Sequence, residues 1–240
     1  SLAPENVVNQ ELGLEYNDGT FVFEISVYNS EISDVVFDKF KGREGVFYEN
    51  IGDLESVGFE LVAGYQADNF DVLISYNSND VELNNAPFVW PDANDPLGFS
   101  TVVLNGVDLA AYEYGGLGNA VGDSINLNVN YELNDDIAMG FNLNYVASLD
   151  DIEVFHRSIE LGWQSALETV DKPSYTVVDA YVTYTPIKNL TLDLAIQNLL
   201  DESYRSHGSV ADYGHISGYE SVVGIKEPGR DIRITASYQF

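Results

Sequence analysis

The sequence has no cysteine, one methionine and only ten lysine and arginine residues against 39 acidic ones. Without cysteine, the chain can form neither a disulfide framework nor a thiolate metal site. Its formal net charge of −29 argues against nucleic-acid binding, because that binding depends on lysine and arginine to neutralise phosphates. We therefore expect no nucleic-acid partner.

Long apolar runs are also lacking. No segment approaches the roughly 20 apolar residues of a membrane-spanning helix, and the N-terminus lacks the charged and then apolar pattern of a signal peptide. Because the sequence starts at Ser1 and its single methionine is Met139, we expect it to be a piece of a longer polypeptide. Its hydrophobic fraction of 45% is nevertheless sufficient for a folded structure.

Alternation of apolar and polar residues recurs along the chain, and helical periodicity is hard to find. The last segment shows it clearly, since Ile232 and Ile234 share one face of a strand while Arg233 and Thr235 share the other. This strand is expected to run to Phe240. Eight further segments alternate in the same way, beginning near residues 11, 21, 57, 70, 125, 137, 175 and 190. The sequence therefore predicts an all-β fold of nine antiparallel strands.

Short and long connections alternate between these strands. Short turns at 17–20, 66–68, 134–136 and 186–189 are separated by long connections at 30–54, 79–122, 150–173 and 199–230. Four structureless connections of this length are unusual in a compact soluble domain. Short turns at one end and long loops at the other are typical of outer-membrane barrels. In such a barrel the apolar faces contact lipid, and the asparagine-rich faces line the interior.

Several motifs resemble those of TonB-dependent outer-membrane receptors, and they follow the family's order over nearly the whole chain. These motifs are Leu2-Ala3-Pro4-Glu5 with Glu11-Leu12-Gly13, Asn50-Ile51-Gly52 with Gly58-Phe59-Glu60, Asn198-Leu199-Leu200-Asp201 with Tyr204, and Glu227-Pro228-Gly229-Arg230. Leu200 stands where the family usually has phenylalanine. We expect Asn198 and Asp201 to bond nearby backbone where a strand leaves the membrane, and Pro228-Gly229 to form a turn.

The resemblance implies a transmembrane β-barrel that the family builds from twenty-two strands, of which residues 1–240 would be the C-terminal segment. The plug domain, the TonB-binding box and the first strands would lie upstream. It also implies a Gram-negative outer-membrane receptor that captures and imports an iron chelate, haem or a ferric siderophore. Energy would come from the TonB-ExbB-ExbD complex through the N-terminal part. No cofactor is expected beyond the transported chelate.

The end of the chain resembles the C-terminal signal read by the barrel-assembly machinery. Tyr238 and Phe240 would carry this signal, with Phe240 held in the closing strand. Outer-membrane lipid and the assembly machinery are therefore expected partners.

Candidate ligand-binding residues lie in the long connections, which contain all three histidines. They are His156, His207, Tyr213, His215 and Tyr219. Histidine and tyrosine are axial ligands of haem iron, although such residues in loops are more often ordinary surface residues. The stretch from Lys172 to Asp179 resembles the haem-receptor branch of the family, which favours haem over a siderophore.

Two other functions stay open. A passive porin-like channel would need neither plug nor energy input. An outer-membrane hydrolase is less favoured, because the sequence has no G-x-S-x-G, H-E-x-x-H or phosphate-loop motif. We expect no enzymatic activity and no resident metal, since the acidic pairs Asp135-Asp136 and Asp150-Asp151 are typical of solvated turns.

Overall fold

The computed structural model describes residues 2–40, 46–50, 52–91, 101–110, 122–158, 164–207 and 226–240. Within these ranges the regular structure is β, and no helix is long and apolar enough to cross a membrane. The strands are β1 (Asn6–Asn17), β2 (Phe21–Ser33), β3 (Val36–Phe40), β4 (Val46–Asn50), β5 (Asp53–Gln66), β6 (Phe70–Pro91), β7 (Thr101–Ala110), β8 (Ser124–Asn134), β9 (Ile137–Val146), β10 (Leu149–Ser158), β11 (Gln164–Lys172), β12 (Tyr175–Ile187), β13 (Leu190–Gln197) and β14 (Asp231–Tyr238).

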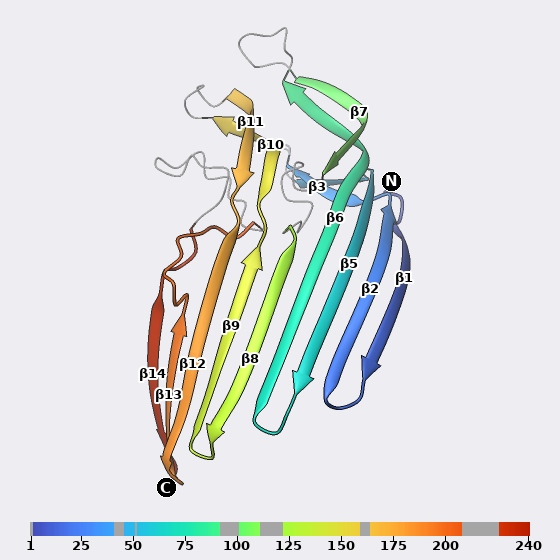
Figure 1. Cartoon of the computed structure of the whole chain (residues 1–240). Coiled ribbons are helices and arrows are strands. Elements are labelled where there is room, and N and C mark those ends of the chain that lie inside the picture. Colours follow the sequence, from blue (N-terminus) through green and yellow to red (C-terminus); the bar gives the residue numbers. More distant parts are fainter. Residues whose placement is uncertain are drawn as a thin grey trace.

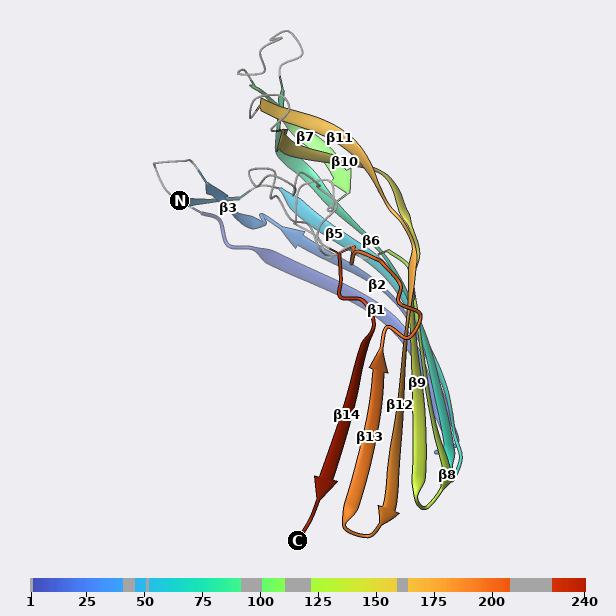
Figure 2. The same cartoon turned by 90° about the vertical axis from the view of Figure 1, so that its left-hand side faces the viewer.

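Nine strands form one meander in the order β1-β2-β5-β6-β8-β9-β12-β13-β14, and every pairing in it is antiparallel. The predicted nine-strand path is therefore confirmed. The sheet is strongly curved, and the hairpins of the long connections lean over its concave side (Figures 1 and 2). The N-terminus lies at the long-loop end and the C-terminus at the short-turn end (Figure 1).

Asparagine and aspartate side chains fix two of the short turns, β1–β2 and β8–β9. The Asn17 side chain accepts a hydrogen bond from the backbone of Gly19 at 2.9 Å, and Asp18 accepts from Thr20 and Phe21 at 2.9 and 2.7 Å. In the β8–β9 turn, the Asn134 side chain accepts hydrogen bonds from the backbone N–H groups of Asp136 and Ile137. These local bonds favour a turn over continued strand, so they set the register of each hairpin.

Strands extend into segments that the sequence analysis assigned to long connections. The hairpin β3–β4, the hairpin β10–β11 and the outer part of β6 paired with β7 all lie there. In β6, Val81 and Leu83 continue the alternation and are only 7% and 0% exposed. The expectation of structureless loops was therefore wrong at these places. In β6 the reason is that the period-two pattern continues beyond the length needed to cross a bilayer.

The end of the last strand also differs from the prediction. β14 ends at Tyr238, although the backbone N–H of Gln239 still donates to the carbonyl of Asn189 at 3.0 Å. Phe240 is fully exposed and its ring lies 5.1 Å from that of Tyr238. The strand therefore does not run to the final residue, and Phe240 is not held in it.

The two faces of the sheet differ in polarity. On one face apolar side chains are exposed, as with Leu12 at 75% and Ile234 at 78%. Near the short turns this face carries a row of aromatic contacts that crosses β2, β5, β6 and β8, namely Phe21–Tyr65, Tyr65–Phe70 and Phe70–Tyr131. An aromatic band beside exposed apolar residues is typical of a lipid-facing barrel surface.

Candidate functional site

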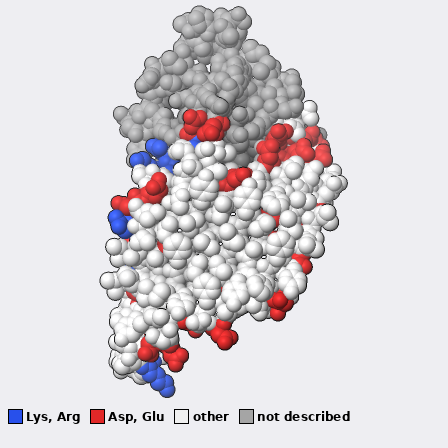
Figure 3. Space-filling view, in the orientation of Figure 1, with Lys and Arg blue, Asp and Glu red and all other residues white. Residues whose placement is uncertain are grey.

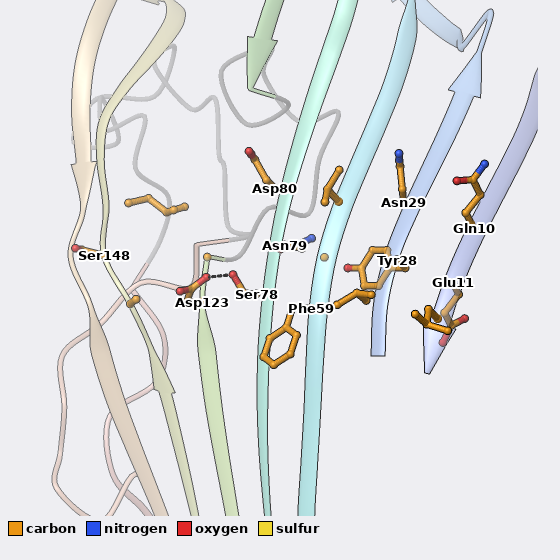
Figure 4. A pocket seen from close by; sticks show the side chains of 17 residues that line it. Gln10, Glu11, Tyr28, Asn29, Phe59, Ser78, Asn79, Asp80, Asp123 and Ser148 are labelled. Atoms are coloured by element: carbon orange, nitrogen blue, oxygen red, sulfur yellow. Dashed lines mark hydrogen bonds between the residues drawn. The ribbon is translucent and has the colours of Figure 1, made fainter. Parts of the chain in front are cut away.

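A recess of about 940 Å³ lies toward the long-loop end, lined by β1, β2, β5, β6 and the segments just before β8 and just after β9 (Figure 4). Its lining includes Glu11, Tyr28, Asn79, Asp123 and Ser148. This volume is within the range of sites that hold small organic ligands. The recess therefore combines a suitable size with carboxylate, amide and hydroxyl groups.

Tyr28 lies across β5 at the floor of this recess (Figure 4). Its register partner is Gly58, and a Cβ placed on that glycine would overlap the phenol ring. Gly58 therefore provides the space that lets Tyr28 lie along the wall. Gly58 is also the glycine of one of the receptor-like motifs, so the motif has a physical function in this fold.

Asp123 fixes the edge of the recess where β8 begins. Its carboxylate accepts hydrogen bonds from the hydroxyls of Tyr76 at 2.8 Å and Ser78 at 2.5 Å. Its carbonyl accepts from the backbone N–H of Ala147 at 2.8 Å. Asp123 thus ties the middle of β6, the start of β8 and the end of β9 together.

An asparagine-centred junction closes the long-loop end near β1. The side chain of Asn50 accepts from the backbone N–H of Ala3 at 2.8 Å and donates to the carbonyls of Ala3 and Asp34 at 3.1 and 2.6 Å. Glu5 accepts from the backbone N–H of Val36 at 2.7 Å. The two N-terminal motifs therefore meet in space, although 45 residues or so separate them in the sequence.

A second junction, centred on Asn198, lies near β14. Asn198 is 4% exposed, and its side chain donates to the carbonyls of Glu202 at 2.9 Å and Pro228 at 3.3 Å. It also accepts from the backbone N–H of Glu202 at 2.8 Å. Asp201 accepts from the backbone N–H of Arg230 at 2.9 Å. The predicted backbone-bonding roles of Asn198 and Asp201 are confirmed.

Side-chain hydrogen bonds cover the polar face of β6, β8, β9 and β12. The Tyr181 hydroxyl reaches across Gly140 and donates to Asn130, which in turn donates to Asp71 at 2.8 Å and Asn128 at 2.9 Å. Asn128 donates to Asn142. This amide network joins β6, β8, β9 and β12 through side chains of the asparagine-rich face.

His207 is the one candidate ligand residue whose side chain the structure describes. It is 2% exposed, its Nε2 lies 3.1 Å from the carbonyl oxygen of Pro173, and its ring packs edge-on against Tyr175 at 5.4 Å. Tyr175 in turn stacks on Tyr204 at 4.6 Å. In this position His207 joins the segment after β13 to the β11–β12 connection.

The other candidate residues are not brought together by the described structure. His156 lies in β10 opposite Ala166. Tyr213, His215 and Tyr219 lie outside the described residues. A ligand-binding role for these five residues stays a prediction. No group of three or more histidine, aspartate or glutamate side chains in the described ranges could hold a metal ion.

Sequence reasoning missed Lys172 and the Tyr–Gly pairs. Lys172 is 5% exposed although it stands at the end of a strand among polar residues, and no pattern in the sequence signals this burial. The pairs Tyr28–Gly58 and Tyr181–Gly140 join residues of different strands. Only knowledge of the strand register could have revealed them.

Comparison with known proteins gives a consistent result. The sequence model of the family described as "TonB dependent receptor-like, beta-barrel" matches residues 1–199. The chain is 26% identical over 168 residues to "Heme transporter BhuA" of Brucella abortus, covering 69% of this chain and 23% of that protein. It is 25% identical over 198 residues to "Heme/hemopexin utilization protein C" of Haemophilus influenzae, covering 80% of this chain and 20% of that protein.

Among solved structures, the chain superposes on the FrpB iron transporter from Neisseria meningitidis with a TM-score of 0.68. The identity is 19%, and the match covers 100% of this chain and 32% of that one. The chain therefore spans less than a third of the length of each of these proteins.

Proposed function

The chain belongs to the family of TonB-dependent receptor-like β-barrels, and from this membership we propose that it forms part of the wall of an active transporter for an iron chelate. The observation that carries the proposal is the sheet itself, with an exposed apolar face, an aromatic band and a hydrogen-bonded polar face. Such a sheet suits a boundary between lipid and a polar interior.

We place the chain in the outer membrane of a Gram-negative bacterium, with the short turns in the periplasm and the long-loop end outside. The transported compound would be haem or a ferric siderophore, and the two haem-related relatives favour haem. TonB, ExbB and ExbD would supply energy through the part of the receptor upstream of this chain. In this proposal, Tyr238 and Phe240 serve barrel assembly, which the full exposure of Phe240 permits.

The recess beside Tyr28 and Asp123 is proposed as part of the capture surface. Its 940 Å³ volume and mixed lining can hold one face of a chelate of haem size. His156, Tyr213, His215 and Tyr219 are proposed contacts from the long connections, and His207 would have to leave its contacts with Pro173 and Tyr175 to bind a metal.

Growth on haem tests this function. A deletion of the gene in an iron-limited culture should abolish growth with haem as the iron source, and a wild-type copy should restore it. Removing TonB should give the same loss. A growth defect of the deletion strain that does not depend on haem would contradict haem as the transported compound. Haem uptake that persists without TonB would favour the passive-channel alternative.

A further inference from the structure

A lysine is buried at the long-loop end, where its ammonium contacts a backbone carbonyl. Lys172 is 5% exposed, and its ammonium donates to the carbonyl oxygen of His207 at 2.5 Å. In the part of the chain that the structure describes, no carboxylate forms a salt bridge with it. Burial lowers the pKa of the Lys172 ammonium. Since buried charges are normally paired, this arrangement is costly unless an anion completes it.

A recess of about 160 Å³ has Lys172 in its lining. Two chain segments line it, 171–174 at the β11–β12 connection and 202–207 after β13. This space exceeds the roughly 30 Å³ that one water molecule occupies in the liquid, so a carboxylate or phosphate group can enter. Asn198 and Asp201 hold the second segment in place through the bonds described above.

Basic residues gather around the recess in a chain that has few of them. Arg205 lines it, and Lys226 donates to the hydroxyl of Ser203, another lining residue, at 2.8 Å. Basic and acidic atoms lie side by side over the upper ends of β12 to β14 (Figure 3). Asp171 and Glu202 also line the recess, so its lining carries two basic and two acidic residues, of which Lys172 is the buried one. Solvent screens the exposed charges of Asp171, Glu202 and Lys226 more than that of Lys172.

We propose that the recess at Lys172 is a binding site for an anionic oxygen group, either a carboxylate or a phosphate. The Lys172 ammonium would donate to the anion, and the hydroxyls of Ser203 and Ser206 lie in the same lining. The anion could belong to a small molecule captured at the cell surface or to a lipid headgroup of the outer leaflet. Binding in solution requires no transport, so this site and the proposed function can fail independently.

The test compares Lys172→Met with wild type in the intact receptor that contains this chain, purified in zwitterionic detergent. Acetate and inorganic phosphate are the probes, and calorimetric titration and the thermal midpoint are the measurements. Wild type should bind at least one probe saturably and gain stability from it. Lys172→Met should lose about tenfold to hundredfold in affinity, as expected for a charge-assisted hydrogen bond. Lys188→Met, in the short β12–β13 turn, removes an equal charge and should change nothing.

The rival interpretation is that Lys172 merely clamps the His207 carbonyl. It predicts that Lys172→Met lowers the midpoint without any anion, and that anions stabilise both proteins equally. If Lys172 instead forms an anion site, Lys172→Met should have an unchanged or higher thermal midpoint in anion-free buffer, because the substitution removes the buried charge. Lys172→Arg should retain binding, and it replaces Lys172→Met as the informative variant if the latter does not fold.

Two further arms complete the experiment. Wild-type affinity should fall as pH rises through the lowered pKa of Lys172, and the residual affinity of Lys172→Met should not follow this profile. Phosphatidylcholine vesicles with and without lipid A distinguish the sources, since only a headgroup site is occupied by lipid A and then excludes inorganic phosphate. Equal binding of both probes by wild type and Lys172→Met, or no binding by either, would overturn the proposal.

Discussion

The two halves of the sheet are built with the same two devices, used to different degrees. The half from β1 to β6 has an asparagine junction at Asn50 and a tyrosine lying over a glycine, Tyr28 over Gly58. The half from β8 to β14 repeats both, with Asn198 and with Tyr181 over Gly140. The halves thus allow a matched comparison within one molecule.

The two devices differ between the halves in the burial of the asparagine and in the hydrogen bonding of the tyrosine. Asn198 is buried and Asn50 is half-buried. The Tyr181 hydroxyl bonds Asn130, whereas among the described residues the Tyr28 hydroxyl has no hydrogen-bond partner. The comparison indicates that these two devices hold the C-terminal half more firmly than the N-terminal half, whose inner face depends more on what occupies the interior.

The largest effect is expected for Asn198→Ala. Three side-chain hydrogen bonds are lost in a buried place, and Asn198 has a φ of 50°, which alanine tolerates poorly. We expect a loss of about 3 kcal/mol in the free energy of unfolding, measured by denaturant titration in lipid vesicles. Asn50→Ala should cost about 1 kcal/mol, because water can replace its bonds.

A control separates backbone strain from hydrogen bonding at this position. Asn198→Gly removes the same hydrogen bonds but accepts the positive φ, so it should recover about 1 kcal/mol relative to Asn198→Ala. Equal losses for Asn50→Ala and Asn198→Ala would show that burial does not distinguish the two junctions.

The next effect concerns the glycines under the tyrosines. In Gly140→Ala the new Cβ displaces the Tyr181 ring and breaks its bond to Asn130, so we expect a loss of about 2 kcal/mol. In Gly58→Ala the Tyr28 ring can turn away at a smaller cost of about 1 kcal/mol. The same denaturant titrations measure both. A larger loss of stability in Gly58→Ala than in Gly140→Ala would indicate that the N-terminal half, and not the C-terminal half, is held more firmly.

Removing the hydroxyl of either tyrosine should change the free energy of unfolding by a smaller amount. Tyr181→Phe leaves the side-chain Oδ1 of Asn130 without this donor, and we expect a cost of about 1 kcal/mol in the free energy of unfolding. Tyr28→Phe should change stability by less than about 0.5 kcal/mol. Amide hydrogen exchange of β8 and β12 should accelerate only in Tyr181→Phe, so equal exchange in both variants would contradict the network's contribution.

The nine-strand wall was predictable because each strand carries its own local signal. In β14, Ile232 and Ile234 alternate with Arg233 and Thr235, and turn residues such as Asn134 mark the hairpin ends. The roles of Asn198 and Asp201 were predictable in kind, because these side chains bond backbone in turns on any fold.

The tyrosine–glycine pairs and the burial of Lys172 and His207 could not be predicted, because they depend on strand register and on long-range contacts. Tyr181 meets Gly140 and Asn130 only when β8, β9 and β12 pair in one particular alignment. The burial of Lys172 and His207 depends on two segments separated by more than 30 residues. The outer part of β6 did carry a local alternation, and the expectation of a loop there followed the connection pattern instead.

The smallest expected effect concerns the inner face of the first half, where Glu15 and Glu24 stand directly opposite each other in β1 and β2. Like charges in this position repel, so Glu24→Gln should raise stability by about 0.5 kcal/mol at low salt. The gain should shrink in high salt, where the repulsion is screened. Glu132→Gln, on the same face of β8 opposite Ala138, is the matched control and should show no such salt dependence. If Glu24→Gln is instead destabilising at every salt concentration, this carboxylate is needed by the folded wall, and the first half is more self-sufficient than the comparison indicates.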